Sequence, residues 1–515
     1  MSNVTAESLY TSLEGRRYTY LTRARQASRI TLPYIMTDEG FGAHSRLHTP
    51  FQGIGARGVN NLASKLLLAL LPPNAPFFRL NVDKYSLKAE GAPDEMITGI
   101  ESALQGVEDS VMDEISRETY RVGVHEALKH LIITGNALVY LPDEGGMRVF
   151  HLDRYVIERD PMGNILSMAT KETVAYNTLP DDVKEAIGAD YEGKSGDEDC
   201  DLYTAVCRHG DKWHVYQDIH GVRLPDSEGY YPLDKNPYIP LRFSRIDGED
   251  YGRGYVEEYL GDLQSLETLT QSIVEGSAAA AKVLFLVNPN GTTRARTLAE
   301  SPNGAIAQGN AQDVSVLQLN KFNDFRVAQE TINTIKDRLG HAFLLTSGVV
   351  RQAERVTAEE IRMLSQELES ALGGLYSLLS TELQMPMVNR LMSVMNKKKA
   401  LPKLPKDIVN PVIITGVEAL GRGNDLQKLD MFLAGATQVV GPEAVAQHVN
   451  VSEYFSRRAT ALGIKTQGLI KSAEQIQAET QQAQQMQMAE KLGPSGIRAV
   501  SDNIKQQNQI QSEEQ

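Results

Sequence analysis

Apolar residues recur every three or four positions through several stretches of the N-terminal half, which is the spacing of an amphipathic helix. This spacing predicts helices over residues 5–32 (closed by Pro33), 54–71, 96–116 and 122–134. From 137 to 251 the period changes toward two, with clusters of Gly, Pro and Asp between the segments 137–141, 148–152 and 212–217. The first half is therefore predicted to be a mixed α+β region, interrupted by an exposed acidic loop over 191–201.

The second half is predicted to contain two helices on either side of a small module. Residues 255–283 contain no proline and carry Leu and Ile at helical spacing, which predicts one helix of about 43 Å at 1.5 Å per residue. Residues 284–321 combine a β-prone run with turn residues and are expected to form a compact module. A second helix over 324–343 and a loop over 344–355 follow.

A further helix is expected to start at a capping box, with Thr357 as N-cap and Glu360 at the third helical position, and to continue to about residue 396. Gly373, Gly374 and Pro386 lie inside this helix and are predicted to bend it. The C-terminal part is expected to form helical fragments over 425–440 and 443–462, a solvated Gln-rich helix over 474–490 and a disordered end.

Composition limits the classes of protein that the chain can belong to. With 515 residues, 41% hydrophobic and 23% charged, it is expected to fold into several globular units. The net charge of −14 argues against tight nucleic-acid binding over a large surface. Cys200 and Cys207 cannot supply a disulfide framework and make a poor zinc pattern. No secretory signal and no membrane span are predicted.

One glycine motif raises an alternative function. Residues 53–58, GIGARG, match G-x-G-x-x-G and open a predicted helix, as in dinucleotide-binding folds. That fold also needs a strand before the motif and an acidic residue about twenty positions later. HTPFQ precedes it instead, and the helix after it ends at Pro72-Pro73. Close helix packing is favoured, and a nucleotide-binding enzyme that uses Gly53 to Gly58 stays open as the alternative.

No other motif predicts catalysis or a cofactor, since P-loop, HExxH, GxSxG and paired CxxC patterns are all absent from the sequence. His125 and His130 are five residues apart, about 140° around a helix, so they are not expected to share a metal ion. The adjacent carboxylates Asp181-Asp182 and Glu257-Glu258 are expected to be solvated. Trp213 is expected in the core. These residues therefore predict no catalytic site, cofactor or metal ion.

A charge gradient runs along the two predicted helices and the module between them. Residues 256–281 carry five acidic and no basic residues, a charge of −5. Residues 282–355 carry nine basic and six acidic residues, a charge of +3. In one isolated chain such runs are usually solvated faces, but in a ring of copies they would become stacked belts of alternating sign.

The sequence resembles the portal (head-to-tail connector) proteins of short-tailed bacteriophages that encode their own RNA polymerase. Four stretches carry the resemblance: PFQGIGARGVNNLASKLLLALLPPNAPFFRL, SRIDGEDYGRGYVEEYLGDLQSLE, LVNPNG and ERVTAEEIRMLSQELESALGGLYSLLSTELQMPMV. Together they extend it over most of residues 1–430. The Gln-rich end adds only composition.

The resemblance implies an α+β, mainly helical subunit that assembles, as twelve copies, into a ring around a DNA channel. By segment it implies a wing (1–254), stem helices (255–283 and 322–342), a clip (284–321), a channel loop (343–355), a kinked wing helix (356–400), a crown (401–473) and a C-terminal tail (474–515). The pattern itself independently predicts only the two helices around a small module. Another phage ring, such as a tail adaptor or nozzle, is the remaining structural alternative.

The implied function is a DNA conduit at one capsid vertex for genome packaging, retention and ejection, assembled in the host cytoplasm and carried in the virion. The implied partners are double-stranded DNA without sequence preference, the packaging ATPase (terminase large subunit), a tail adaptor, the major capsid and scaffolding proteins, and internal core proteins. No membrane is implied. The resemblance also implies that the chain is not an enzyme, because the ATPase is a separate chain in this family, which agrees with the missing P-loop.

Within that framework we expect sparse basic belts to make weak phosphate contacts, because uniform attraction would trap the DNA and uniform repulsion would oppose filling. The expected DNA contacts are Lys336 and Arg338 on the second stem helix and Arg351 and Arg355 on the channel loop. For Arg355, an ion pair with a carboxylate of the wing is an equally good interpretation. We expect Gly348 to act as the hinge of that loop.

Two arginines of the clip are further candidates. Arg294 and Arg296 lie in the predicted module, where the family's packaging ATPase docks and its tail adaptor later replaces it. They are candidates for contacting acidic surfaces of such partners. Solvated loop charges are an equally good interpretation.

Overall fold

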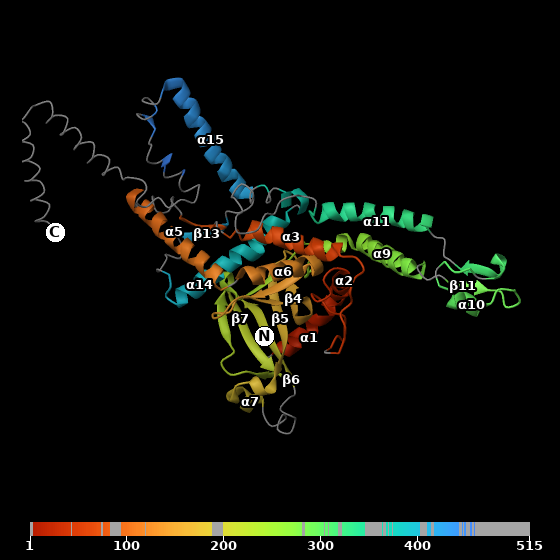
Figure 1. The fold of residues 1–515 in the computed structure, drawn as a ribbon. Helices are drawn as coiled ribbons and strands as arrows, with labels where there is room; N and C mark the ends of the chain where they lie inside the picture. Colours follow the sequence, from red (N-terminus) through yellow and green to blue (C-terminus); the bar gives the residue numbers. More distant parts are fainter. Residues whose placement is uncertain are drawn as a thin grey trace, which may run out of the picture. The chain divides into compact units, whose positions relative to one another are not determined.

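In the computed structural model the chain forms two compact units, Met1–Gly416 and Val417–Gln515 (Figure 1). The residues described are 4–42, 44–73, 76–82, 94–118, 120–187, 199–280, 284–302, 304–306, 308–317, 322–345, 363, 367–368, 370–372, 374–401, 409–413, 417–441, 445, 448–449, 454–455 and 458. The first unit holds the large hydrophobic core.

The N-terminal helices lie close to the predicted positions, with one break. They are α1 (Ala6–Glu14), α2 (Tyr18–Arg29), α3 (Ile54–Leu70), α5 (Asp94–Arg117) and α6 (Tyr120–Thr134). The single helix expected over 5–32 is wrong, because a 3-10 turn at Gly15–Arg17 separates α1 from α2. The turn directs the buried Arg17 guanidinium to the backbone carbonyls of Leu152 and Tyr155, at 2.9 and 2.5 Å.

A six-stranded antiparallel sheet forms the centre of the region predicted to be α+β. Its strands are β4 (Tyr155–Arg159), β5 (Ile165–Ala175), β6 (Asp199–His209), β7 (Lys212–Ile219) and β8 (Val222–Arg223), with β9 (Gly229–Pro232) paired to β7. Alternate residues enter different cores, as a strand requires: Trp213 lies in one and Tyr216 in another, against α1. Burial of Trp213 confirms its predicted core position. Helix α7 (Asp181–Ile187) follows β5, and its Asp181 and Asp182 are exposed as predicted.

Two smaller sheets join distant segments of the first unit. β10 (Tyr238–Arg242), β2 (Asn136–Tyr140) and β3 (Arg148–Phe150) form one of them. In the other, β1 (Phe78–Val82) pairs antiparallel with β13 (Val409–Ile413), with Phe78 opposite Ile413. This pairing is not predicted by the hydrophobic pattern, since its strands lie at opposite ends of the unit's sequence.

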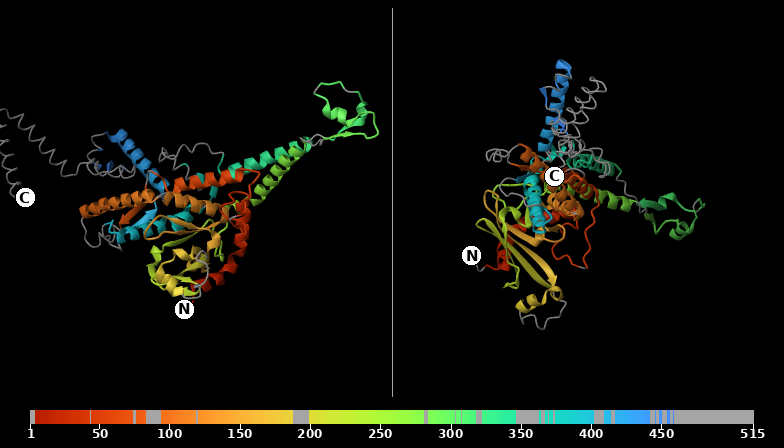
Figure 2. Two further views of the ribbon diagram at one scale, coloured as in Figure 1. Left: turned by 60° about the horizontal axis from the view of Figure 1, so that its bottom comes forward. Right: turned by 90° about the vertical axis from the view of Figure 1, so that its left-hand side faces the viewer.

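The helix expected over 255–283 is two helices. α8 (Tyr255–Glu258) ends at Tyr259, whose φ of −107° and ψ of 13° leave the helical region, and α9 (Leu260–Ala280) continues from there. The cause is aromatic packing, because the rings of Tyr255 and Tyr259 lie 5.7 and 5.9 Å from that of Phe343. α11 (Phe322–Ala342) returns alongside α9, and the three views agree on this pairing (Figures 1 and 2).

A small module lies between α9 and α11 in the sequence. It contains the antiparallel strands β11 (Leu284–Val287) and β12 (Val314–Leu317) and the short helix α10 (Ala295–Glu300). Asp313 organises its turn: one carboxylate oxygen accepts hydrogen bonds from the amides of Thr292 and Thr293 at 2.8 and 3.1 Å, and from both hydroxyls. These bonds hold the pKa of Asp313 below its usual value of 3.8.

The helix predicted to be kinked contains a π-helical turn. Described segments are α13 (Leu375–Leu379), the turn Ser380–Gln384 and α14 (Met385–Lys397). Pro386 is the second residue of α14, directly after the π-helical turn, and Gly374 is the N-cap of α13. Thr357, Glu360 and Gly373 lie outside the described residues.

The second unit contributes one described helix, α15 (Val417–Val440), which includes the predicted fragment 425–440. The Arg458 guanidinium donates to Asp430 at 3.0 Å. The Gln-rich segment, like most of the predicted helix 443–462, lies outside the described residues. No helix in the described parts of either unit combines the length and hydrophobicity needed to cross a bilayer.

Two of the three glycines of the GIGARG motif, Gly55 and Gly58, serve close packing of α3, as predicted. A Cβ added to Gly55 would lie 2.8 Å from the carbonyl oxygen of Ile30, and one added to Gly58 would lie 2.6 Å from Cγ of Phe343. Phe343 is completely buried, so its ring cannot move aside into solvent. Only a residue without a side chain fits α3 at this contact.

We predict that Gly58→Ala lowers the unfolding free energy by about 1–3 kcal/mol, the usual cost of overpacking a core. The matched control is Gly106→Ala, an exposed mid-helix glycine with open space around its Cα, which should gain about 0.5–1 kcal/mol. Denaturant unfolding of the full-length protein, followed by circular dichroism, measures both. Equal effects of the two substitutions would contradict the close contact.

We also predict that Asp313→Asn speeds hydrogen exchange at the Thr292 and Thr293 amides several-fold, because a neutral amide oxygen accepts more weakly than a carboxylate. Since the folded-state pKa is lowered, the wild-type turn should be fully stabilised above pH 3.8 and should loosen as the pH falls below that value. Glu300→Gln is the control, because Glu300 pairs only with Arg296 on the exposed surface. Unchanged exchange in Asp313→Asn would rule out this role.

Candidate nucleic-acid interface

The α9–α11 hairpin carries the residues predicted to contact DNA. Leu263 and Leu266 of α9 and Ile332, Ile335 and Leu339 of α11 are buried between the two helices and the body of the unit. Beyond Leu266 no residue of α9 is buried. The hairpin is thus a narrow two-helix arm that exposes most of its surface.

The middle of α3 holds the base of the hairpin. Asn61 donates from Nδ2 to the carbonyls of Phe343 and Leu344, at 3.0 and 3.1 Å, and the buried Lys65 ammonium donates to Leu344 at 3.1 Å. These donors satisfy carbonyls that the end of α11 leaves without helical partners. Leu344 has a φ of +54°, so the chain turns sharply just where the predicted channel loop begins.

Lys336 and Arg338 are both exposed on α11 but lie on opposite sides of its buried stripe, because two residues correspond to about 200° around a helix. Arg338 donates to Asp262 of α9 at 2.7 Å. Lys336 has no ion pair with any residue that the structure describes. The two side chains therefore cannot act as one patch within a single chain.

The α11 face turned away from the buried stripe carries charges that the sequence analysis did not select. Arg326, Glu330 and Asp337 are exposed there. Their helical spacing, together with the spacing of the buried Ile332, Ile335 and Leu339, could have revealed this face. Its mixture of signs makes it nearly neutral.

The acidic run over α8 and α9 has fewer unpaired carboxylates than its charge of −5 indicates. Glu257 pairs with Arg23 at 3.3 Å, so the expectation of a solvated carboxylate holds for the exposed Glu258 but not for Glu257. Asp262 is used by Arg338. Both paired carboxylates tie the arm to basic groups of the same chain.

Glu267 occupies the position that a phosphate would take in the nucleotide-binding alternative. Its carboxylate accepts hydrogen bonds from the amides of Phe51 and Gln52, at 2.8 and 3.2 Å, just before α3 begins. The Gln52 side chain in turn accepts from the Gly55 amide at 2.9 Å. The two residues directly before the motif therefore bind the chain's own carboxylate, and no strand precedes the motif among the described residues. This arrangement does not fit a dinucleotide.

The remaining predicted residues do not form a common site within the described part of the chain. Arg294 is the exposed N-cap of α10, and Arg296 is exposed and pairs with Glu300 at 2.8 Å. Gly348, Arg351 and Arg355 lie outside the described residues.

Comparison with known proteins identifies the family. The family model for the bacteriophage head to tail connecting protein matches residues 3–470. The portal protein of Escherichia phage T7 is 41% identical over 96% of this chain and 92% of its own. The portal proteins of Enterobacteria phages T3 and SP6 are 42% and 30% identical, over 92% and 97% of this chain and 89% and 96% of their own.

Among solved structures, the neck of a native gene transfer agent particle aligns with a TM-score of 0.37 and 10% identity, over 80% of this chain and 90% of its own. We draw nothing from so distant a likeness. The family match and the portal proteins confirm the resemblance inferred from the four sequence stretches. The chain therefore belongs to the bacteriophage head-to-tail connecting proteins, the family of phage portal proteins.

Proposed function

We propose that copies of this chain close into a ring, of twelve subunits as in the family, through which double-stranded DNA passes at one vertex of the capsid. The segment assignments follow the resemblance: wing (1–254 and 356–400), stem (255–283 and 322–342), clip (284–321), channel loop (343–355), crown (401–473) and tail (474–515). One refinement is proposed: the crown begins after Gly416, because β13 pairs with β1 of the first unit.

The observation that carries the ring is the uncovered apolar surface of the arm and its module. Phe285 and Leu286 are consecutive on β11, so they point to opposite faces, and they are 66% and 53% exposed. A two-stranded sheet without a covered face is marginal in water. Val274 on α9, Val327 on α11 and Ile306 in the module are also exposed. Neighbouring copies around a ring would cover these side chains.

The proposed channel contacts rest on two basic side chains of α11, one of which is already in an ion pair. Lys336 is exposed and unpaired among the described residues, whereas Arg338 shares its charge with Asp262. A ring would repeat each basic group at one level along the channel axis. A DNA phosphate at that level would then lie near a cation whatever the rotation of the duplex in the channel. Arg351 and Arg355 on the channel loop, with Gly348 as its hinge, complete the proposed set.

The proposed partners follow from the same assignment. The module over 284–321, with Arg294 and Arg296, would face the packaging ATPase and later the tail adaptor. The wing would contact the major capsid and scaffolding proteins, and the crown the internal core proteins. We propose that the chain itself is not an enzyme and acts in the virion, at the portal vertex, after assembly in the host cytoplasm.

We predict that Phe285→Asp weakens ring formation, because it places a charge where an apolar contact between copies is proposed. Met162→Asp is the matched control: Met162 is 71% exposed, in the turn between β4 and β5. Mass photometry of the full-length proteins should show the closed ring for wild type and Met162→Asp, and a shift toward monomers for Phe285→Asp. A wild-type chain that stays monomeric would sink the proposed ring itself.

We predict that replacing Lys336 and Arg338 together by Gln reduces the DNA retained in filled heads, since each lost phosphate contact weakens binding without regard to sequence. Asp262→Asn should act in the opposite direction, because it releases Arg338 from its ion pair. Arg208→Gln, an exposed cation on β6, is the control. Heads assembled with each variant are assayed for packaged genome length. Equal lengths in all four would refute the contacts.

A further inference from the structure

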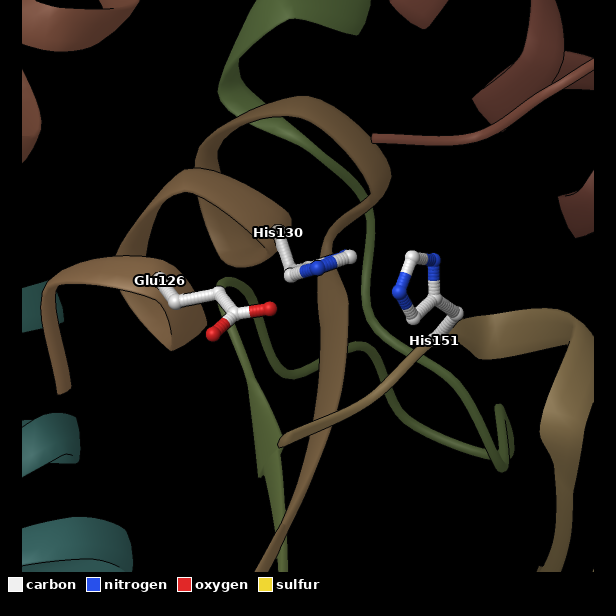
Figure 3. A group of neighbouring side chains, drawn as sticks. All are labelled: Glu126, His130 and His151. Atoms are coloured by element: carbon white, nitrogen blue, oxygen red, sulfur yellow. The ribbon is translucent and has the colours of Figure 1, made fainter. Parts of the chain in front are cut away.

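Three side chains with metal-binding chemistry meet inside the first unit, away from the α9–α11 arm. Each of Glu126, His130 and His151 offers one ligand atom, and these atoms all lie within 4.8 Å of one another. Figure 3 shows the His130 ring between the Glu126 carboxylate and the His151 ring. Glu126 and His130 come from α6, and His151 follows β3, so the cluster joins two elements.

His130 is the unexplained member of the cluster. The residue is 1% exposed, and neither of its ring nitrogens has a hydrogen-bond partner among the described residues. A buried polar group without a partner is costly and rare, so it calls for a missing ligand.

His151 is held in the orientation that a ligand needs. Its Nδ1 donates a hydrogen bond to the carbonyl oxygen of Ile35 at 2.9 Å, so Nδ1 carries the proton and Nε2 keeps its lone pair. The rings of His130 and His151 meet edge to face, with centroids 4.6 Å apart. A backbone carbonyl behind a metal-binding imidazole is the usual means of fixing its tautomer and ring direction.

Glu126 supplies the negative charge. It precedes His130 by four residues on α6, so both side chains project from the same side of the helix. Figure 3 shows its carboxylate directed toward His130. Glu126 is exposed, whereas His130 is buried, so the cluster opens to solvent on the side of the carboxylate. An ion has an entry path, and a water molecule can complete its coordination.

We propose that Glu126, His130 and His151 bind a divalent transition-metal ion, with Zn²⁺ as the ion that fits best. Two imidazoles and one carboxylate are a ligand set that zinc accepts, with water as the fourth ligand. Ligands of a tetrahedral zinc ion lie about 3.3 Å apart, given bonds of about 2.0 Å. The three ligand atoms already lie within 4.8 Å of one another, so side-chain rotations would bring them to this spacing. The ion would fasten α6 to the segment after β3.

The test uses the full-length protein with Zn²⁺ and, as a spectroscopic probe, Co²⁺. Metal analysis after equilibrium dialysis should find one zinc ion per subunit, and Co²⁺ should give the visible absorption of a site with few ligands. Glu126→Gln keeps the exposed side chain's shape and should weaken zinc binding at least about tenfold. The control is His125→Gln, since His125 lies beside Glu126 on α6 but outside the cluster, at 3.4 Å from the hydroxyl of Ser64.

A second pair of measurements separates metal binding from folding. His151→Asn retains a donor for the Ile35 carbonyl but removes the Nε2 ligand, and should lose zinc while keeping the wild-type circular dichroism spectrum. Zinc should raise the melting temperature of wild type and His125→Gln but not of the other two variants. Failure of the wild type to bind Zn²⁺ or Co²⁺, or equal binding by Glu126→Gln, would overturn the site. Neither result would bear on whether the chain forms the proposed ring.

Discussion

The close contact between Gly58 and Phe343 determines where the arm meets the rest of the first unit. Phe343 directly follows α11, and its ring fills the space left by the missing side chain of Gly58 on α3. The same ring packs against Tyr255 and Tyr259, where α9 begins. Both helices of the arm are therefore fixed at one point. The orientation of the arm relative to the rest of the first unit depends on this junction, because a two-helix hairpin with little buried surface cannot fix that orientation by itself.

The charges of the arm follow from the same geometry. Glu267 lies on α9 within reach of the Phe51 and Gln52 amides, so the N-terminal end of α3 is neutralised from within the chain. Asp262 and Arg338 neutralise each other across the hairpin. A lining built from such pairs is weaker than the sequence charges indicate. That weakness suits a conduit in which a polyanion has to move, since each strong unpaired cation would add to the energy needed to leave a position.

Local patterns predicted much of the fold because they depend on near neighbours. The spacing of Ile100, Leu104, Val107 and Val111 placed α5, and the assignment of the GIGARG motif to packing holds for Gly55 and Gly58. The break at Tyr259 was missed because it depends on Phe343, far along the chain.

The candidate site was less predictable for the same reason. Lys336 and Arg338 were selected as one group from their charges, but helix geometry separates them and only the fold shows that Asp262 pairs with Arg338. The sequence analysis correctly separated His125 from His130. It had no means of finding His151 beside His130, because a loop and a strand pairing bring them together.

The metal cluster and the arm are connected through α6. This helix carries Glu126 and His130, and it packs against both α3 and α8. The Phe343 ring contacts Gly58 of α3 and also packs against Tyr259, which ends α8. In the proposed conduit, force on the arm would pass into the rest of the first unit through these helices. An ion that fastens α6 to the segment after β3 would restrain the layer directly behind the junction. The restraint would act without touching DNA, because the cluster's three residues all lie outside the arm.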